Sequence, residues 1–345
     1  MIDAAHLLPD ISTVSDRLAR VFALLSPFGT DSRFHWTGLV AFLVLGSAVY
    51  LWQARRAGPQ EAGSGPLGFL FPPALYRTAS SFVDVKVYLA GRLIRPLIAM
   101  VTLPLKALIV MACAGLVASG GGSSSAQLQE PGPLSIILAS LIIALMSDFS
   151  YYVVHRLSHE SALLWPFHKL HHSAEVLTPI TAKRNHPVFD LLRALVGVVM
   201  LAPLYGIVFG LFGIVDFTTI FGLTVLIALM NLTGGALRHS HIWLDFGPVL
   251  DRILISPAQH QIHHSLAPKH HDCNYGLTLA VWDWMFGTLY VPQSREVLAF
   301  GVADREGNPE PQVHRSLKEA YLVPFTEAAS ARRRGRAQDL SEERA

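Results

Sequence analysis

The sequence predicts an all-α fold: a polytopic bundle of about five membrane helices with a helical cap on the cytoplasmic face. The first observation is composition, since 51% of the 345 residues are apolar and only 15% are charged, against roughly 25% charged in an ordinary soluble protein. The second is a set of long apolar stretches. The third is the placement of histidine, because thirteen of the sixteen histidines fall between His155 and His271.

Five apolar stretches have close to the ~20 residues that a helix needs to cross a bilayer. The fourth and fifth are separated by a single charge, Asp216, which predicts a helical hairpin with its turn near Gly210–Asp216. The stretches are Trp36–Trp52, Leu97–Ala118, Leu134–Val154, Ala194–Val215 and Phe217–Leu237.

Loop charges predict the orientation of these helices. The segments between the first and second helices and between the third and fourth are rich in Lys and Arg, whereas Gly120–Pro133 has neither. The positive-inside rule therefore places both basic segments, and everything after the fifth helix, on the cytoplasmic side. We accordingly expect all thirteen clustered histidines at one membrane face.

Three regions are expected along the chain: 1–133 with two membrane helices, 134–292 with the histidines, and 293–345 as a C-terminal extension. The charged, Arg-rich end from Ala329 to Ala345 lacks apolar periodicity, which favours disorder. The net charge of +2 gives no nucleic-acid signal, and the two cysteines suggest no disulfide framework. The N-terminus shows no pattern of a cleaved signal peptide.

Three histidine clusters share one geometry. His155 and His159 are four residues apart, and H-x-x-H-H occurs twice, at 168–172 and at 260–264. On a helix, residues three and four apart lie on one face with Cβ atoms about 5–6 Å apart. The spacing therefore lets two or three imidazoles from each cluster reach a common metal ion.

The ligand count favours two metals over one. A catalytic zinc takes three protein ligands and a structural zinc takes four, usually including thiolates, so eight imidazoles exceed the need of one ion. The zinc-protease motif H-E-x-x-H is missing. Imidazole also binds iron, copper and nickel, so nitrogen ligands alone do not choose the metal.

At these residues the chain resembles the fatty acid hydroxylase / sterol desaturase superfamily, over roughly Leu134–Pro292. The resemblance is carried by Asp148–His159, Trp165–Ser173, Gln259–Ser265, Asn274–Gly276 and Trp282–Thr288. It implies a membrane oxidoreductase with two iron ions (Fe²⁺), O₂ as co-substrate, and an external electron donor of the ferredoxin or cytochrome b5 type. Relatives in this superfamily hydroxylate or desaturate sterols, fatty acyl chains and related lipids.

Carried over position by position, the resemblance implies metal ligands and no further catalytic residue. His239 matches the position of an additional ligand, and many relatives have Asn where this chain has His241. His186 also recurs in relatives, so both His186 and His241 are candidates for a ligand or a neighbouring role. The implied ligands are His155, His159, His168, His171, His172, His239, His260, His263 and His264.

Asp148 lies seven residues before His155, on the same helix face. It either orients a liganding imidazole or pairs with Lys106 inside the membrane, where an unpaired charge is costly. Tyr275 and Asp283 are candidates to support the metal ligands, although we expect them to serve packing.

The pattern leaves three kinds of function open. The first is a lipid C–H hydroxylase or desaturase, and the sequence does not choose between these reactions. The second is a non-catalytic membrane protein that binds metal or lipid, and the third is a zinc-dependent membrane hydrolase.

Overall fold

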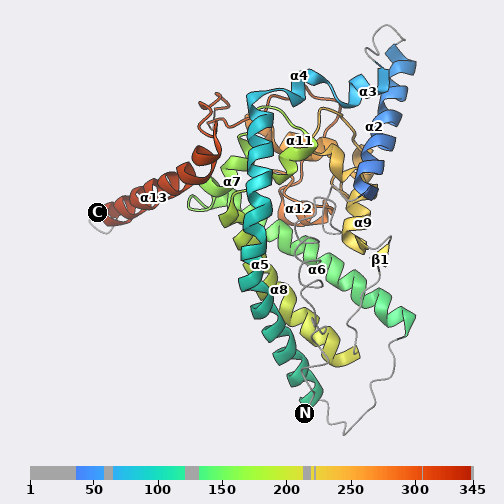
Figure 1. Cartoon of the computed structure of the whole chain (residues 1–345), viewed down its shortest axis with the longest axis vertical. Helices are drawn as coiled ribbons and strands as arrows, with labels where there is room; N and C mark the ends of the chain where they lie inside the picture. The colour runs from blue at the N-terminus through green and yellow to red at the C-terminus, as the bar shows by residue number, and fades with distance from the viewer. Residues whose placement is uncertain are drawn as a thin grey trace.

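The computed structural model describes residues 36–57, 65–120, 132–212, 219–220, 223–304 and 306–342 (Figure 1). Within these ranges the chain is mainly helical, and its one sheet is the two-residue pair β1 (Thr219–Ile220) and β2 (Leu223–Thr224). The predicted all-α class is confirmed.

Four helices of the described residues are long and apolar enough to span a membrane: α2 (Trp36–Ala57), α5 (Ala79–Gly120), α6 (Pro133–Glu160) and α8 (Pro187–Phe212). Their large apolar side chains face outward, as Met100 and Leu116 on α5 are each 72% exposed. A soluble protein rarely exposes so large an apolar surface. The chain is therefore a multi-pass membrane protein.

The fifth apolar stretch, Phe217–Leu237, is not one long helix. It forms the pair β1–β2, the eight-residue helix α9 (Val225–Leu232) and the 3₁₀ turn η3 (Gly235–Leu237). Gly234 ends α9 with φ of +75°, a conformation that glycine adopts without steric cost. The predicted hairpin turn lies partly outside the described residues, since α8 ends at Phe212.

Helix α5 begins at Ala79, well before the predicted Leu97. The additional turns contain charged residues and are amphipathic, so hydropathy alone underestimates the helix. Farther along, α5 packs closely on α8, because α8 has glycine at positions 206 and 210. A Cβ atom at Gly206 would come within 3 Å of the backbone of Val110 on α5. A Cβ atom at Gly210 would likewise come within 3 Å of the backbone of Ala114. Small residues four apart allow this close approach of membrane helices.

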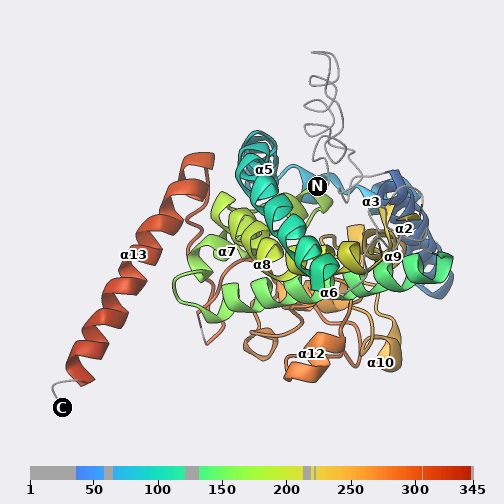
Figure 2. The same ribbon diagram turned by 90° about the horizontal axis from the view of Figure 1, so that it is seen from below.

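Short elements join these helices and form the cap. They are α3 (Gly65–Leu70), α4 (Pro73–Tyr76), α7 (Trp165–His172), η2 (Pro179–Lys183), α10 (Gly247–Leu250), α11 (Pro257–His263), η4 (Pro268–His270) and α12 (Val281–Phe286). In Figure 2 α10 and α12 lie on the opposite side of α6 from α5.

The C-terminal segment is helical where disorder was expected. Helix α13 (Leu317–Glu342) projects away from the body of the protein (Figures 1 and 2). Its base packs on α7 and α5. The segment is rich in Ala, Glu and Arg, which are strong helix formers. Helix α13 therefore extends through it, although the segment lacks the apolar stripe of a helix that packs on a protein core.

A buried ion pair fixes the cap to the membrane bundle. Arg184 Nη1 lies 2.8 Å from Asp84 Oδ1 on α5, and both side chains are fully buried. Arg184 also donates to the carbonyl oxygen of Leu170 on α7 and to Ser173 Oγ. One guanidinium therefore holds α5 and α7 in a fixed relation.

We predict that Arg184→Met destabilises the protein by about 3–5 kcal/mol, because it leaves the Asp84 carboxylate buried and unpaired. The matched control is Arg156→Met, whose pair with Glu160 is partly exposed and contributes less than about 1 kcal/mol. Chemical unfolding in detergent micelles measures both, and equal losses would contradict the assignment.

Candidate metal centre

All nine histidines implied as ligands lie together in two groups. Within each group one nitrogen of every ring lies within 4.8 Å of one nitrogen of every other ring, and eight of the nine residues are buried. Group one consists of His155, His159, His168, His172 and His263, and group two of His171, His239, His260 and His264.

Helix geometry decides how each H-x-x-H-H box divides. On α7, His168 and His172 are one turn apart and join group one, whereas His171 joins group two. On α11 the division is reversed, because His260 and the following His264 join group two and His263 joins group one. Each box therefore contributes to both groups, and the groups adjoin, with the rings of His172 and His264 4.5 Å apart.

The remaining three histidines come from other elements. His155 and His159 lie in the last turns of α6, and their rings are 5.2 Å apart. His239 follows η3 and brings its Nε2 atom to 3.2 Å from Nε2 of His171 and to 3.1 Å from Nε2 of His260. Three ring nitrogens thus converge at group two.

Backbone carbonyls fix the orientation of two rings. His155 Nδ1 lies 2.7 Å from the carbonyl oxygen of Tyr275, and His263 Nδ1 lies 2.7 Å from that of Cys273. A carbonyl only accepts, so each Nδ1 carries the proton and each Nε2 offers its lone pair to the centre. This is the usual arrangement for a metal-binding histidine.

The loop that carries these carbonyls is itself strained and anchored. Asp272 and Asn274 have φ of +57° and +55°, which is rare outside glycine. The Asp283 carboxylate accepts from the backbone N–H groups of Tyr275 and Gly276, each at 2.8 Å. These bonds hold the carbonyl groups toward the histidines.

The donor set fits metal ions. Burial and the neighbouring imidazoles hold the pKa of His168, His172 and His264 well below the ordinary 6.5, and burial lowers the pKa of His263 to about 4. These rings are therefore neutral at pH 7, as ligands must be. Across the two groups, several buried ring nitrogens have no hydrogen-bond partner among the described residues. They are His159 Nε2, His168 Nδ1 and Nε2, His172 Nε2, His260 Nδ1, His263 Nε2, and His264 Nδ1 and Nε2.

Asp148 takes neither of its two expected partners. Its carboxylate accepts from the backbone N–H of Thr278 at 2.9 Å, from that of Leu279 at 3.1 Å, and from Trp282 Nε1 at 2.9 Å. Lys106 instead lies over the ring of Tyr205, 4.4 Å from its centroid. Asp148 thus acts on His155 indirectly, by holding the segment whose Tyr275 carbonyl binds that ring.

The other candidate histidines lie outside both groups. His186 accepts from the Val188 N–H at Nδ1, and its Nε2 donates to the Tyr321 carbonyl at 3.1 Å. His241 Nε2 lies 2.7 Å from the Phe69 carbonyl. Both rings are thus engaged in connecting segments of the fold.

Sequence reasoning underestimated Tyr275. Its ring is fully buried and lies 5.0 Å from that of His159 and 5.6 Å from that of His155. Its hydroxyl donates to Asp272 at 3.0 Å. Its position inside the quoted Asn274–Gly276 motif was the available signal, but contact with the histidines depends on the fold of the loop.

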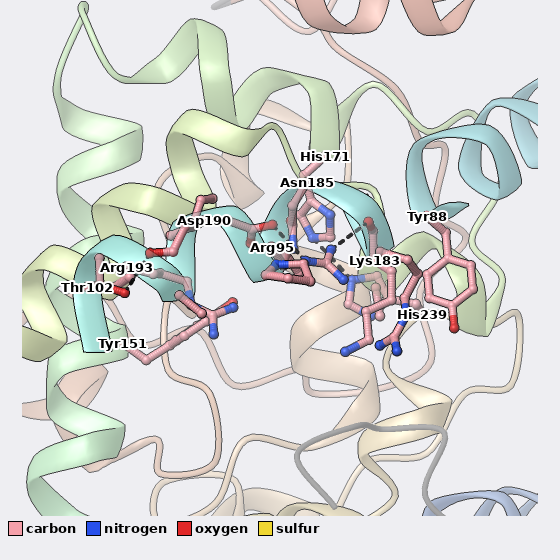
Figure 3. A pocket seen from close by; sticks show the side chains of 16 residues that line it. Tyr88, Arg95, Thr102, Tyr151, His171, Lys183, Asn185, Asp190, Arg193 and His239 are labelled. Atoms are coloured by element: carbon pink, nitrogen blue, oxygen red, sulfur yellow. Dashed lines mark hydrogen bonds and ion pairs between the residues drawn. The ribbon is translucent and has the colours of Figure 1, made fainter. Parts of the chain in front are cut away.

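Two cavities reach the centre. One, of about 310 Å³, lies between α5 and α8 and is lined by His171 and His239 of group two (Figure 3). The other, of about 350 Å³, is lined by His159, His172, His263 and His264 together with the acidic residues Glu160, Asp272 and Asp304.

The fold and the site together define a class of protein: a multi-pass helical membrane protein with a two-part polyhistidine centre. Residues 140–288 match the sequence model of the fatty acid hydroxylase family. The resemblance predicted from the histidine boxes is thereby confirmed over this segment.

Curated relatives include proteins named as a lipid hydroxylase, a monooxygenase and a desaturase. The chain is 33% identical to an ornithine lipid hydroxylase of Rhizobium tropici over 51% of this chain and 48% of the relative. It is 32% identical to an alkylglycerol monooxygenase of Xenopus tropicalis, over 44% and 30% respectively. It is 29% identical to a Delta(7)-sterol 5(6)-desaturase of Eremothecium gossypii, over 48% and 41%. The chain thus spans less than half of each relative, and no solved structure matches it significantly.

We predict that metal uptake stays constant from pH 8 to about pH 6 and falls as the pH approaches 4. An ordinary histidine would gain its proton near 6.5, but burial lowers the pKa of His263 to about 4, so protons compete only at lower pH. Elemental analysis of protein loaded anaerobically with Fe²⁺ and then desalted measures this. A loss centred near pH 6.5 would show that the rings are not buried as described.

We also predict that Asp148→Ala lowers metal affinity about 10–100-fold, the usual effect of removing a group that supports a ligand. Lys106→Met is the control and should keep wild-type affinity, because Lys106 contacts Tyr205. Competition with a metal-binding dye gives both affinities. Equal losses of metal affinity in the two variants would instead support an Asp148–Lys106 ion pair.

Proposed function

We propose that this protein is a membrane non-haem di-iron oxygenase that hydroxylates or desaturates a lipid. The observation that carries the proposal is the convergence of nine histidines in two adjoining groups, each of which offers at least four nitrogens. Two ions with nitrogen ligands, placed side by side, suit a reaction that needs two electrons from the site.

The two groups would each hold one iron ion, His155 and its partners the first and His171 and its partners the second. An iron pair bound there supplies the activation of O₂ and the removal of hydrogen from an unactivated C–H bond. The protein's part is to fix and shield the site.

The overall reaction balances in either form. In hydroxylation one oxygen atom of O₂ enters the C–H bond and the other leaves as water, with two electrons and two protons consumed. In desaturation the lipid loses two hydrogens and both oxygen atoms leave as water, with the same two electrons and two protons. The electrons come from an external donor of the ferredoxin or cytochrome b5 type.

The two cavities suggest separate routes to the centre. The cavity between α5 and α8 is bordered by membrane helices, so a lipid reaches it without full transfer to water. The acidic cavity is lined by Asp272, whose carboxylate is 3.9 Å from His159 Nδ1 and accepts from the Tyr275 hydroxyl. We assign the second route to protons and water, with the Asp272 carboxylate as the group at its mouth.

The substrate is proposed to be a lipid of the broad kinds named among the relatives: a sterol, a fatty acyl or ether lipid, or an amino-acid lipid. We further propose that the active site lies at the cytoplasmic face of the membrane, which the basic segments support through the positive-inside rule.

The test is lipid turnover by purified protein in nanodiscs with Fe²⁺, O₂ and a reducing system. We expect O₂ consumption and a lipid product heavier by sixteen mass units, for insertion of oxygen, or lighter by two, for desaturation. His171→Ala and His263→Ala should each lower the rate more than about 100-fold, because each removes a ligand from a different group. His241→Ala should retain wild-type rate, because His241 lies outside both groups. Unchanged turnover in His171→Ala and His263→Ala would refute the proposal.

A further inference from the structure

The cavity between α5 and α8 is lined by an excess of positive charge. Four basic side chains line it, from three separate elements: Arg92 and Arg95 on α5, Lys183 on η2, and Arg193 on α8. Among the described residues that line the cavity, Asp190 is the one acid.

The single carboxylate is already committed. Asp190 Oδ2 lies 2.8 Å from Arg95 Nε, and Arg95 Nη2 also donates to the Lys183 carbonyl at 3.5 Å (Figure 3). Asp190 therefore balances one cation and holds the Arg95 guanidinium in place. The Arg193 guanidinium lies over the ring of Tyr151, 5.7 Å from its centroid, at the other side of the same cavity.

Cations gathered in a partly enclosed cavity repel each other, and an anion that binds among them lowers this repulsion. Arginine in particular presents a planar fork of N–H donors that matches the oxygens of phosphate or carboxylate. Lys and Arg are also attracted to membrane surfaces in general. That attraction would not explain why side chains from three separate elements line one cavity.

The other wall of the cavity is apolar and continuous with the membrane surface. Pro96, Ile98 and Ala99 on α5 and Ala194 on α8 line it. Next to them Leu97 and Met100 face outward, 60% and 72% exposed. The cavity thus offers charge for a polar head and an apolar exit for a chain.

We propose that this cavity binds the anionic headgroup of a lipid, a phosphate or a carboxylate, between Arg92, Arg95, Lys183 and Arg193. This deepens the proposed function and rests on it, because His171 and His239 of group two line the same cavity. A lipid bound there has the carbons next to its headgroup beside the metal centre. The substrate class is therefore a lipid with an anionic head.

Binding to metal-free protein tests the inference without depending on catalysis. The full-length protein in neutral detergent is titrated with short-chain phosphatidic acid and with the diacylglycerol of the same chains, and intrinsic tryptophan fluorescence reports the Kd. We expect phosphatidic acid to bind at least ~10-fold more tightly than diacylglycerol. Arg193→Gln and Arg95→Gln should each weaken phosphatidic acid binding by roughly 10–100-fold, since each removes a charge-assisted hydrogen-bond donor, and should leave diacylglycerol binding unchanged.

Lys86→Gln is the matched control, because Lys86 is an exposed cation on the same helix that does not line the cavity. It should leave both Kd values unchanged. Arg193 is exposed, so the Arg193→Gln variant should fold. This holds even if the Arg95→Gln variant is destabilised by loss of the Arg95–Asp190 pair. Iron content of all variants should match wild type.

Three results would overturn the inference: equal affinity for the anionic and neutral lipids, an equal effect of Lys86→Gln and Arg193→Gln, or displacement of phosphatidic acid by an equal concentration of inorganic phosphate. The last would assign the cavity to a free anion. Failure of lipid turnover with intact anionic binding would count against the oxygenase proposal alone, and turnover without anionic preference would count against this inference alone.

Discussion

The structure depends on the burial of neutral imidazoles whose lone pairs point at one another. Buried polar atoms are normally hydrogen-bonded, and each one that is not costs about 1–3 kcal/mol. Here the nitrogens of His168 and His264 are buried without such partners among the described residues. An ion that takes these lone pairs would remove this cost, so metal binding would contribute directly to folding. Much of the surrounding fold serves to bring these rings together and keep them neutral.

The supports of the centre come from outside the histidine boxes. Asp148 on α6 and Asp283 on α12 both bind backbone N–H groups of the loop that presents carbonyls to His155 and His263. The centre is also asymmetric in charge, since the cavity beside group two is mostly basic and the one beside group one is acidic.

Hydropathy and local pattern predicted the membrane character and four of the long helices. They overestimated Phe217–Leu237, whose composition alone fits a span, because the pair β1–β2 precedes the short helix α9 and the left-handed Gly234 follows it. They underestimated α5, whose first turns contain Asp84 and Arg95; the partners of these charges, Arg184 and Asp190, come from distant parts of the sequence. Pairing of charges across elements is invisible to a scan along the chain.

From the sequence alone, the i, i+3 and i+4 spacing predicted eight of the histidines of the candidate site, because that spacing is a property of each local helix, and the family resemblance added His239. Only the tertiary structure decided that every H-x-x-H-H box divides between two groups, and that His186 and His241 lie elsewhere. It also decided that Asp148 supports a loop 130 residues away in the chain. The physical reason is that helix geometry fixes which side chains share a face, whereas the packing of α6, α7 and α11 fixes which faces meet.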